Sequence, residues 1–187
     1  MNVVIRRARP DELDQVVELV SDASQWLGSR GLDQWQYPPR AGRIKKGITA
    51  GEVWVLEQPD GELIGTMALD SRADPEFWRP EDDPQAALYA HRMVVARKAA
   101  GHGLGAEMLD WAGGQAAQAG KKWLRLDAWR TNDQLQRYYL AQGFEHIRTR
   151  DLAHRGSGAL FQRRAVGVPT PQLRNSATPR HRDTVTP

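Results

Sequence analysis

The sequence predicts an α/β (α+β) fold in which helices flank one central sheet. Three observations indicate this class. Hydrophobic periodicity switches between strand and helix patterns in the order β-α-α-β-β-β-α-β-α-β-β. The chain has 187 residues, 40% of them hydrophobic, which is enough for a single domain with a substantial core. In its middle, residues 91–112 read as an apolar strand, a glycine-rich turn and a helix.

The first half of the chain predicts a strand, two helices and a hairpin. Pro10 begins the first helix, since proline and the acidic residues after it suit a first turn. Residues 43–49 are predicted to form the second helix. The apolar face of the first helix consists of Leu13, Val16, Val17, Val20, Ala23 and Leu27. The strands are predicted at residues 3–6, 53–56 and 63–69, the last two joined by the hairpin signal Pro59-Asp60-Gly61.

The second half begins with a polar, proline-containing loop over residues 70–84, which we expect to be a solvated connection. Two helices follow, each ended by a glycine. They are predicted at residues 103–119 and 132–142, and the strands at 87–95, 123–128, 144–149 and 159–163. Beyond that point, prolines alternate with polar residues that cannot build a core. We therefore expect one domain over residues 1–165 and a disordered, Pro-rich C-terminal tail over residues 166–187.

Composition excludes several classes of protein. The absence of cysteine rules out a disulfide scaffold, a thiol nucleophile and a cysteine-based zinc site, and we expect no metal. The N-terminus lacks the apolar segment of a signal peptide. No stretch approaches the roughly 20 apolar residues that span a bilayer, so we expect a cytoplasmic protein without membrane contact. The net charge of +3 lies partly in the tail and is weak evidence for binding nucleic acid, which we do not expect.

The turn after the central strand is a candidate anion site. Gly101, Gly103 and Gly105 stand at alternate positions, where the lack of a Cβ lets a ligand approach the backbone. The helix that follows begins with unpaired N–H groups at its positive end, which suits a phosphate. The spacing matches neither a Walker P-loop nor a dinucleotide fingerprint. An ordinary tight turn would show the same glycines, so the surrounding motifs decide between the two.

Those motifs resemble the Gcn5-related N-acetyltransferase (GNAT) superfamily. The resemblance lies in the stretch from Val95 to Gly105, in Asn132 about thirty residues later, and in the run from Tyr139 to Phe144. The order of elements is similar over almost the entire length to Arg164. The resemblance implies the GNAT fold, a central mixed and mostly antiparallel sheet that is splayed between its fourth and fifth strands.

The glycine turn carries the most specific part of this resemblance. In the family it has the pattern Arg/Gln-x-x-Gly-x-Gly/Ala, and Gly103 and Gly105 match the two small positions. The Arg/Gln position falls on Ala100, which departs from the pattern. Backbone amides are the main phosphate ligands in the family, and Arg97 and Lys98 could supply the missing positive charge.

The resemblance implies acetyl-CoA, or another acyl-CoA, as cofactor. In the family the pantetheine arm enters the opening between the splayed strands and pairs with a free strand edge, here that of Met93, Val94 and Val95. The pyrophosphate would lie on the turn. The turn residues implied in cofactor binding are Ala100, Gly101, His102, Gly103, Leu104, Gly105 and Ala106. Asn132 matches an asparagine that contacts the pantetheine region, and asparagine is also a good helix N-cap.

Tyr139 is the first candidate for a catalytic role. It matches the family tyrosine that often protonates the departing thiolate, a role that also fits its contact with the cofactor. The alternative is a core aromatic paired with Leu135 one helical turn earlier. Tyr138 is expected to point elsewhere on the helix.

His91 is the second candidate, as the base that deprotonates the amine. Histidine is the residue type that titrates near neutral pH. Alternation along the strand places Tyr89, His91, Met93 and Val95 on one face. A structural histidine packed under the first helices, or a water relay to an acid of residues 74–83, are alternatives.

The acceptor is predicted to be a small-molecule primary amine. In this fold the first two helices and the loop before the central strand wall the acceptor site, which here brings in Trp26, Trp35, Gln36 and Tyr37. Aromatic and acidic groups together suit an apolar or aromatic amine with positive charge. The sequence leaves open whether the protein forms a homodimer.

The leading hypothesis is an acetyl-CoA-dependent N-acetyltransferase that works by direct attack of the amine. The alternatives are transfer to a protein or peptide amine, the use of another acyl-CoA, and a sensor of the same fold that binds acyl-CoA without turnover. A nucleic-acid-associated protein is a weaker fourth hypothesis.

Overall fold

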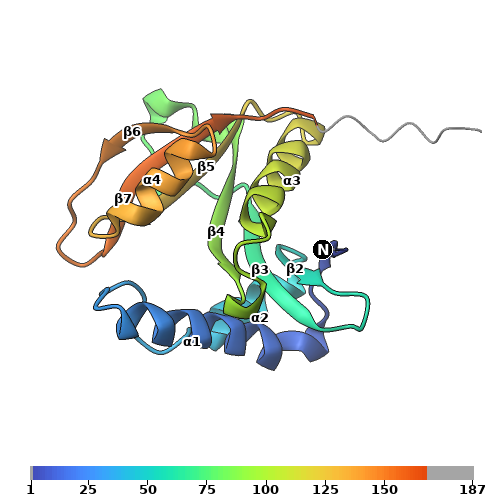
Figure 1. Cartoon of the computed structure of the whole chain (residues 1–187). Coiled ribbons are helices and arrows are strands. Elements are labelled where there is room, and N and C mark those ends of the chain that lie inside the picture. Colours follow the sequence, from blue (N-terminus) through green and yellow to red (C-terminus); the bar gives the residue numbers. More distant parts are fainter. Residues whose placement is uncertain (1, 168–187) are drawn as a thin grey trace, which may run out of the picture.

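A seven-stranded sheet forms the centre of the computed structural model, which describes residues 2–167 (Figure 1). The strand order is β1-β2-β3-β4-β5-β7-β6. Neighbouring strands are antiparallel except β4 and β5, which are parallel. The strands are β1 (Val4–Arg7), β2 (Val53–Glu57), β3 (Leu63–Asp70), β4 (Ala87–Val95), β5 (Trp123–Trp129), β6 (Glu145–Thr149) and β7 (Ser157–Arg164). The predicted mixed, mostly antiparallel sheet is confirmed.

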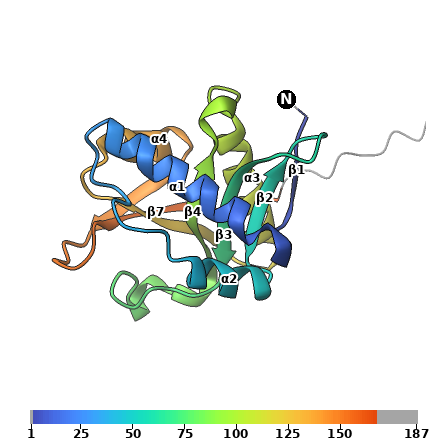
Figure 2. The ribbon, with the colours of Figure 1, turned by 90° about the horizontal axis from the view of Figure 1, so that it is seen from below.

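Helices cover both faces of this sheet. They are α1 (Leu13–Ser29), α2 (Ala41–Thr49), α3 (Leu104–Gln118) and α4 (Asp133–Ala141), and a short 3-10 turn at Pro10–Glu12 leads into α1. Seen from below, α1 crosses the sheet on the side opposite α3 (Figure 2). The predicted helices and strands are confirmed to within two residues at their ends, apart from the 3-10 start of the first helix. None of the helices within residues 2–167 is long and apolar enough to cross a membrane.

Two apolar cores lie on the two faces of the sheet. On one face, side chains of α1 and α2, including Val16, Val20 and Ile44, pack against Val55 and other residues of β2 and β3. On the other face, α3 and α4 pack on a larger core that includes Met108, Tyr139 and Phe161. The predicted apolar stripe of the first helix is confirmed as its packing face, since its members are buried or partly buried in the first core.

The segment between β3 and β4 is more ordered than the solvated loop that we expected. It contains two 3-10 turns, Pro80–Asp82 and Pro84–Ala86. Phe77 and Trp78 are 0% and 4% exposed and form a third core with Tyr89 and Leu160. Polar residues dominate the composition of the segment, but its two aromatic residues anchor it to the sheet. The predicted tail, apart from Val166 and Gly167, lies outside the described residues.

The sheet opens between β4 and β5. These strands pair only from Ala87 with Trp123 to Tyr89 with Arg125, although both continue well beyond those residues. From Ala90 onward, β4 keeps β3 as its strand neighbour and has no strand partner on its other edge. The divergence of two parallel strands creates the opening that positions the candidate site.

An irregularity in β4 corrects one expectation from the sequence. The register with β3 shifts between Val94, opposite Thr66, and His91, opposite Ala68, so β4 has an additional residue there. Arg92 in this bulge has a positive φ of 48°. Met93 and Val95 therefore pack in the α3 core, whereas His91 lies beside Ala68 of the α1/α2 core. The predicted alternation, with Tyr89, His91, Met93 and Val95 on one face, is wrong because a bulge inverts the pleat.

Candidate active site

A cavity of about 1140 Å³ occupies the opening between β4 and β5. Its walls come from both strands, from α1 and the α1–α2 loop, from α4, and from the segment after β3. The α1–α2 loop crosses this opening and is tied to the far side by hydrogen bonds. Asp33 accepts from Trp129 Nε1 at 2.9 Å and from Thr131 Oγ1 at 2.6 Å, which lowers the pKa of Asp33. The cavity is thus bounded by segments that are far apart in the sequence.

The glycine turn has the backbone that the sequence predicts. Gly101 and Gly103 have positive φ values of 84° and 74°, and a Cβ built at either residue would meet nothing within 4 Å. Space beside the turn is therefore open to a ligand. The first backbone bond of α3 runs from Glu107 N to Gly103 O at 3.1 Å. Within residues 2–167 the three preceding amides, those of residues 104–106, donate to no protein acceptor.

Glycine is required at position 105 for a different reason, which is the close approach of Tyr138. A Cβ at this position would lie 2.6 Å from Tyr138 Oη. Tyr138 therefore packs against the first turn of α3 and lines the cavity beside Tyr139, with their ring centroids 5.7 Å apart. We expected Tyr138 to point elsewhere on its helix, but the fold directs both tyrosines to the same cavity.

These features fit the cofactor that the sequence resemblance implies. Free amides at the positive end of a 15-residue helix are suited to a pyrophosphate. The edge of β4 that lacks a strand partner offers backbone donors and acceptors to an extended, amide-containing chain. Arg97 lies beside the turn, and its guanidinium carbon lies 4.0 Å from the centre of the Trp26 ring. His102 makes one local contact, between Nδ1 and Ala99 O at 3.4 Å.

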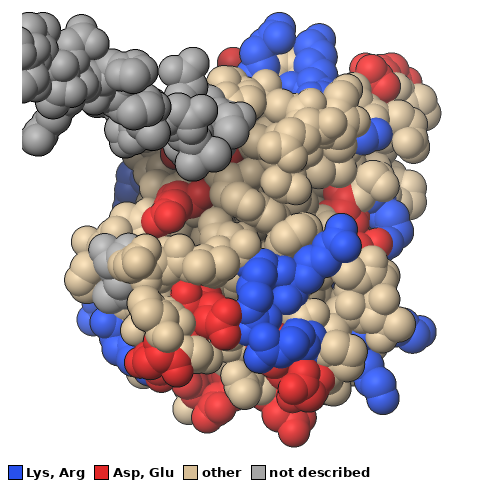
Figure 3. Space-filling model, turned by 90° about the vertical axis from the view of Figure 1, so that its right-hand side faces the viewer, with Lys and Arg blue, Asp and Glu red and all other residues tan. Residues whose placement is uncertain are grey.

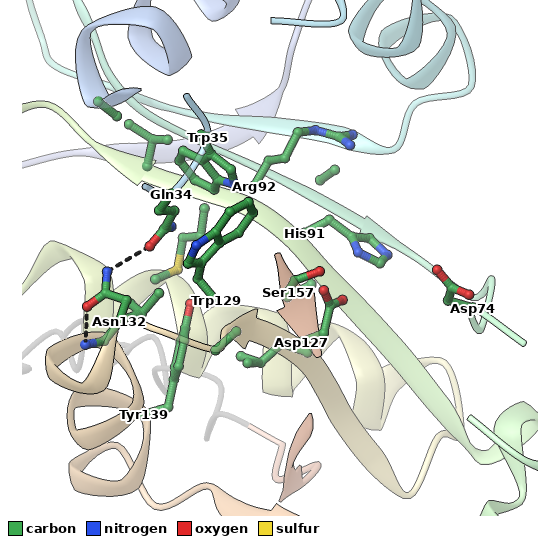
Figure 4. Close-up of a pocket in the computed structure, with 18 of the residues that line it drawn as sticks. Gln34, Trp35, Asp74, His91, Arg92, Asp127, Trp129, Asn132, Tyr139 and Ser157 are labelled. Carbon is green, nitrogen blue, oxygen red and sulfur yellow. Dashed lines mark hydrogen bonds between the residues drawn. The ribbon is translucent and has the colours of Figure 1, made fainter. Parts of the chain in front are cut away.

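Tyr139 is buried in α4 with its hydroxyl toward the cavity (Figure 4). Its ring packs edge-on against Phe144 with centroids 5.7 Å apart and lies 5.9 Å from Phe161. Burial, with smaller contributions from Tyr138 and Asp127, raises the pKa of Tyr139 above its usual range. The hydroxyl has no hydrogen-bond partner within the described residues. Tyr139 thus combines the core packing that was the structural alternative with a protonated hydroxyl facing the cavity.

His91 lies at the bulge of β4 and lines the same cavity. Its Nε2 is 3.6 Å from Asp70 Oδ1, and its ring turns toward the segment that carries Asp74 (Figure 4). Burial alone would raise the pKa of Asp70. The hydrogen bond and charge of His91, together with the amide and charge of Arg72, outweigh burial and lower the pKa, so Asp70 is a carboxylate. An ionised neighbour of this kind can orient an imidazole that accepts a proton.

Asn132 is the N-cap of α4, as its sequence position suggested. Its Oδ1 accepts from the Leu135 amide at 3.0 Å, and its Nδ2 donates to Gln34 Oε1 at 2.7 Å (Figure 4). Gln34 is 5% exposed and Asn132 6%. No pattern in the sequence singles out Gln34. Its amide resembles that of any surface loop residue until the fold brings it against α4.

The residues predicted to contact the acceptor divide into two groups. Trp26, Trp35 and Tyr37 line the cavity, Trp35 with a positive φ of 58°. Gln36 does not line it. Its side chain instead donates to the Ser24 and Gln34 carbonyl oxygens at 2.8 and 3.0 Å. Gln36 thus shapes the loop that carries Trp35 and Tyr37.

Arg92 and Asp127 are charged cavity residues that reasoning from the sequence missed. Asp127 projects from β5 into the cavity near Ser157 (Figure 4). Within residues 2–167 its carboxylate makes no hydrogen bond or ion pair. A lone carboxylate in the strand Trp123-Leu-Arg-Leu-Asp127-Ala-Trp129 was the available signal, because apolar strands rarely hold an unpaired acid without a function.

Comparisons with known proteins agree with this geometry. The family model described as "Acetyltransferase (GNAT) domain" matches residues 49–146. The "Uncharacterized N-acetyltransferase YesJ" of Bacillus subtilis is 30% identical over 143 residues, which are 73% of this chain and 78% of that protein. A GNAT acetyltransferase structure from Listeria monocytogenes superposes with a TM-score of 0.74 at 25% identity, covering 87% of this chain and 94% of that one. The PaiA N-acetyltransferase of Thermoplasma acidophilum, solved in complex with coenzyme A, superposes with a TM-score of 0.69 at 17% identity, covering 88% and 99%.

Proposed function

The chain belongs to the GNAT acetyltransferase family, and from that premise we propose that it transfers an acetyl group from acetyl-CoA to the primary amine of a small molecule. The observation that carries this proposal is the cavity between β4 and β5. The glycine turn meets this cavity through Gly105, which lies against Tyr138 of the cavity wall, and Tyr139 and His91 both line it. Coenzyme A in the Thermoplasma relative supports an acyl-CoA as the donor.

Each group at the site has a separate role in the proposed reaction. Acetyl-CoA supplies an activated thioester, held by the amides of residues 102–106 and by the free edge of Met93, Val94 and Val95. His91, oriented by Asp70, accepts the proton that the attacking amine must lose. A backbone N–H near Val94 or Val95 offers a hydrogen bond to the oxyanion that develops at the carbonyl. Tyr139 holds a proton at its Oη, which suits protonation of a leaving thiolate.

The α1–α2 loop supports a small acceptor over a protein one. Asp33 and Gln34 bond this loop to Trp129, Thr131 and Asn132 across the opening. Trp26, Trp35 and Tyr37 then restrict the space that remains at the acceptor side of the cavity. A lysine of a folded protein would need this loop to move away, whereas a small amine would not.

An amine-panel assay for release of free CoA tests the proposal. We expect acetyl-CoA to be consumed with at least one small amine and to remain stable without an amine. Peptides with a free N-terminus or lysine belong in the same panel. Turnover of peptides alone would contradict the small-molecule assignment. Tight acetyl-CoA binding without turnover of any acceptor would show a sensor instead.

A further inference from the structure

Arg92 is a cation that the proposed mechanism does not use. It occupies the bulge of β4 with a left-handed backbone, φ 48°, a conformation that is strained for a residue with a Cβ. Its side chain is partly buried and lines the cavity, extending away from His91 (Figure 4). Within residues 2–167 its guanidinium makes no hydrogen bond and no ion pair. Arginine rarely stays buried without an acceptor, because desolvating a charge is costly.

The charges around Arg92 do not neutralise it. Burial, followed by the charge of Arg43, lowers the pKa of the Arg92 guanidinium, and Asp70 opposes this only in part. Asp70 is already bonded by Arg72 Nη2 at 2.7 Å and by the Arg72 amide at 2.8 Å. Arg72 also pairs with Glu52. The one nearby carboxylate is therefore shared with another arginine.

Helix α2 adds to this positive region. Arg43 and Lys46 line the same cavity, and neither forms an ion pair within the described part of the chain. The outer face shown in Figure 3 carries Lys and Arg side chains interspersed with Asp and Glu. Glu52 and Asp70 also line this part of the cavity, but both are paired with Arg72. Arg92, Arg43 and Lys46 are thus left without a carboxylate partner within residues 2–167.

The cavity also contains a carboxylate that is suited to an ammonium group. Asp127 presents a carboxylate without a partner within residues 2–167, and it lines the cavity together with Tyr139. Arg155 lines the cavity too, but its guanidinium is already paired with Asp74 and Glu76. His91, with Asp70 beside it, lines the same cavity from β4. An unpaired carboxylate of β5 and an unpaired guanidinium of β4 thus line one cavity.

We propose that the acceptor is an amino carboxylate, of the amino-acid type, whose carboxylate binds Arg92 while its amine faces His91 and Asp127. The inference rests on the proposed acetyl transfer and adds the substrate class. A planar guanidinium can donate two parallel hydrogen bonds to a carboxylate, which fixes the direction of the acceptor as well as binding it. The aromatic wall of Trp26, Trp35 and Tyr37 then contacts the side chain.

Matched acceptor pairs test this proposal in the wild-type enzyme. Each pair consists of an amino acid and the amine that lacks only its carboxylate, such as phenylalanine with phenethylamine and leucine with isopentylamine. We expect kcat/KM to be about tenfold to a hundredfold higher for the carboxylate member, the usual effect of a charged hydrogen bond. Equal or better turnover of the plain amines would overturn the proposal.

The variant Arg92→Gln assigns the effect to one residue. Glutamine keeps the aliphatic stem that packs beside Val16 and Ile44. We expect it to raise KM for the amino acids, leave the plain amines unchanged, and leave acetyl-CoA affinity intact. A loss shared equally by both members of each pair would contradict the proposal. Lys45→Gln is the matched control, since Lys45 is an exposed cation of α2 that does not line the cavity.

Calorimetry separates this proposal from the proposed function. Amino acids and their N-acetyl derivatives are titrated into wild type, Arg92→Gln and Arg92→Lys without turnover. Binding that Arg92→Gln weakens and Arg92→Lys partly retains supports the carboxylate site even if no amine is acetylated. Absence of binding by every carboxylate of the panel to the wild type overturns the site. If Arg92→Gln does not fold, the wild-type pairs and Arg92→Lys decide.

Discussion

At the scale of single residues, the hydroxyl of Tyr139 can be removed without disturbing its packing. Tyr139→Phe keeps the ring against Phe144 and Phe161. If the hydroxyl protonates a departing thiolate, kcat should fall, up to the roughly 10²–10⁴-fold range of general acid catalysis, with acetyl-CoA affinity nearly intact. A thiolate leaves tolerably well unaided, so a smaller drop is also consistent. Steady-state kinetics and calorimetry measure the two quantities.

Thermal stability is a second measurement on Tyr139→Phe, and it separates a loss of chemistry from a loss of packing. Within residues 2–167 the Tyr139 hydroxyl has no hydrogen-bond partner, so Tyr139→Phe should not lower the melting temperature. Tyr89→Phe is the control, because outside the cavity it removes a bond from Tyr89 Oη to Pro84 O at 2.9 Å and a longer one that Tyr89 Oη accepts from Arg125 Nη1 at 3.4 Å. It should cost stability, about 0.5–1.5 kcal/mol, without lowering kcat. A fully active Tyr139→Phe enzyme would reduce Tyr139 to core packing.

The pH dependence of kcat/KM tests His91. A base must be unprotonated to accept a proton, so kcat/KM should fall as the pH drops below the pKa of the essential group. His91→Gln should shift or abolish this acid limb, whereas Tyr139→Phe should preserve it. His146→Gln is the control, since His146 is exposed and lies outside the cavity. An unaltered limb in His91→Gln would direct the search to Asp127 or to water.

At the scale of the element, the glycine turn depends on its backbone conformation. Gly103 has φ 74°, and valine there would be strained by at least about 1–2 kcal/mol. Gly103→Val should therefore displace the first amides of α3 and fill space left open for the phosphates. We expect acetyl-CoA affinity to fall by about tenfold or more, the value of one charge-assisted donor, in a folded protein. Calorimetry measures the change.

The other end of α3 provides a matched control. Gly120 also has a positive φ, 67°, and open space for a Cβ, but it follows the C-terminal end of α3, away from the free amides of residues 104–106. Gly120→Val should lower stability by a similar amount and leave acetyl-CoA affinity unchanged. A Gly103→Val protein that is folded and binds acetyl-CoA normally would exclude this turn from the cofactor site.

At the scale of the whole molecule, an ion-pair network ties β1 and β2 to the start of α1. Glu12 is 2% exposed and accepts from Arg6 Nη2 at 2.6 Å and Nη1 at 2.9 Å, while Arg6 also binds Glu57. The hydrogen bond from Arg6 lowers the pKa of Glu12 against the opposing effect of burial. A lowered folded pKa adds stability above the unfolded value near 4.5, and this stability is lost as the pH falls below it.

Glu12→Gln tests this network. It should lower the free energy of unfolding at neutral pH by about 1–3 kcal/mol, because Arg6 keeps a weaker acceptor. The variant should also lose less stability than the wild type between pH 4.5 and lower values, since it has no proton to take up at this position. Melting temperatures against pH measure both effects. Glu18→Gln, on the exposed side of α1, should follow the wild-type curve, and equal pH dependence of all three proteins would contradict the assignment.

The sequence by itself determined the elements and the most local part of the site. Apolar periodicity fixed the order of helices and strands, since period 3.6 and period 2 depend only on neighbouring residues. The positive φ of Gly101 and Gly103 follows from residue type, and so does the N-cap role of Asn132. Tyr139 could be selected because its motif lies within one helix and the turn after it.

The tertiary structure decided which distant residues meet. The bulge at Arg92 inverts the pleat of β4, and nothing in the local pattern of alternating residues indicates an inserted residue. Gln34 meets Asn132 across 98 positions, and Phe77 and Trp78 anchor a segment whose composition is polar. A role for the charges of Arg92 and Asp127 can be inferred only once the fold shows that both line one cavity between two diverging strands. Periodicity records which face a side chain occupies, whereas the partner on that face depends on how the whole chain packs.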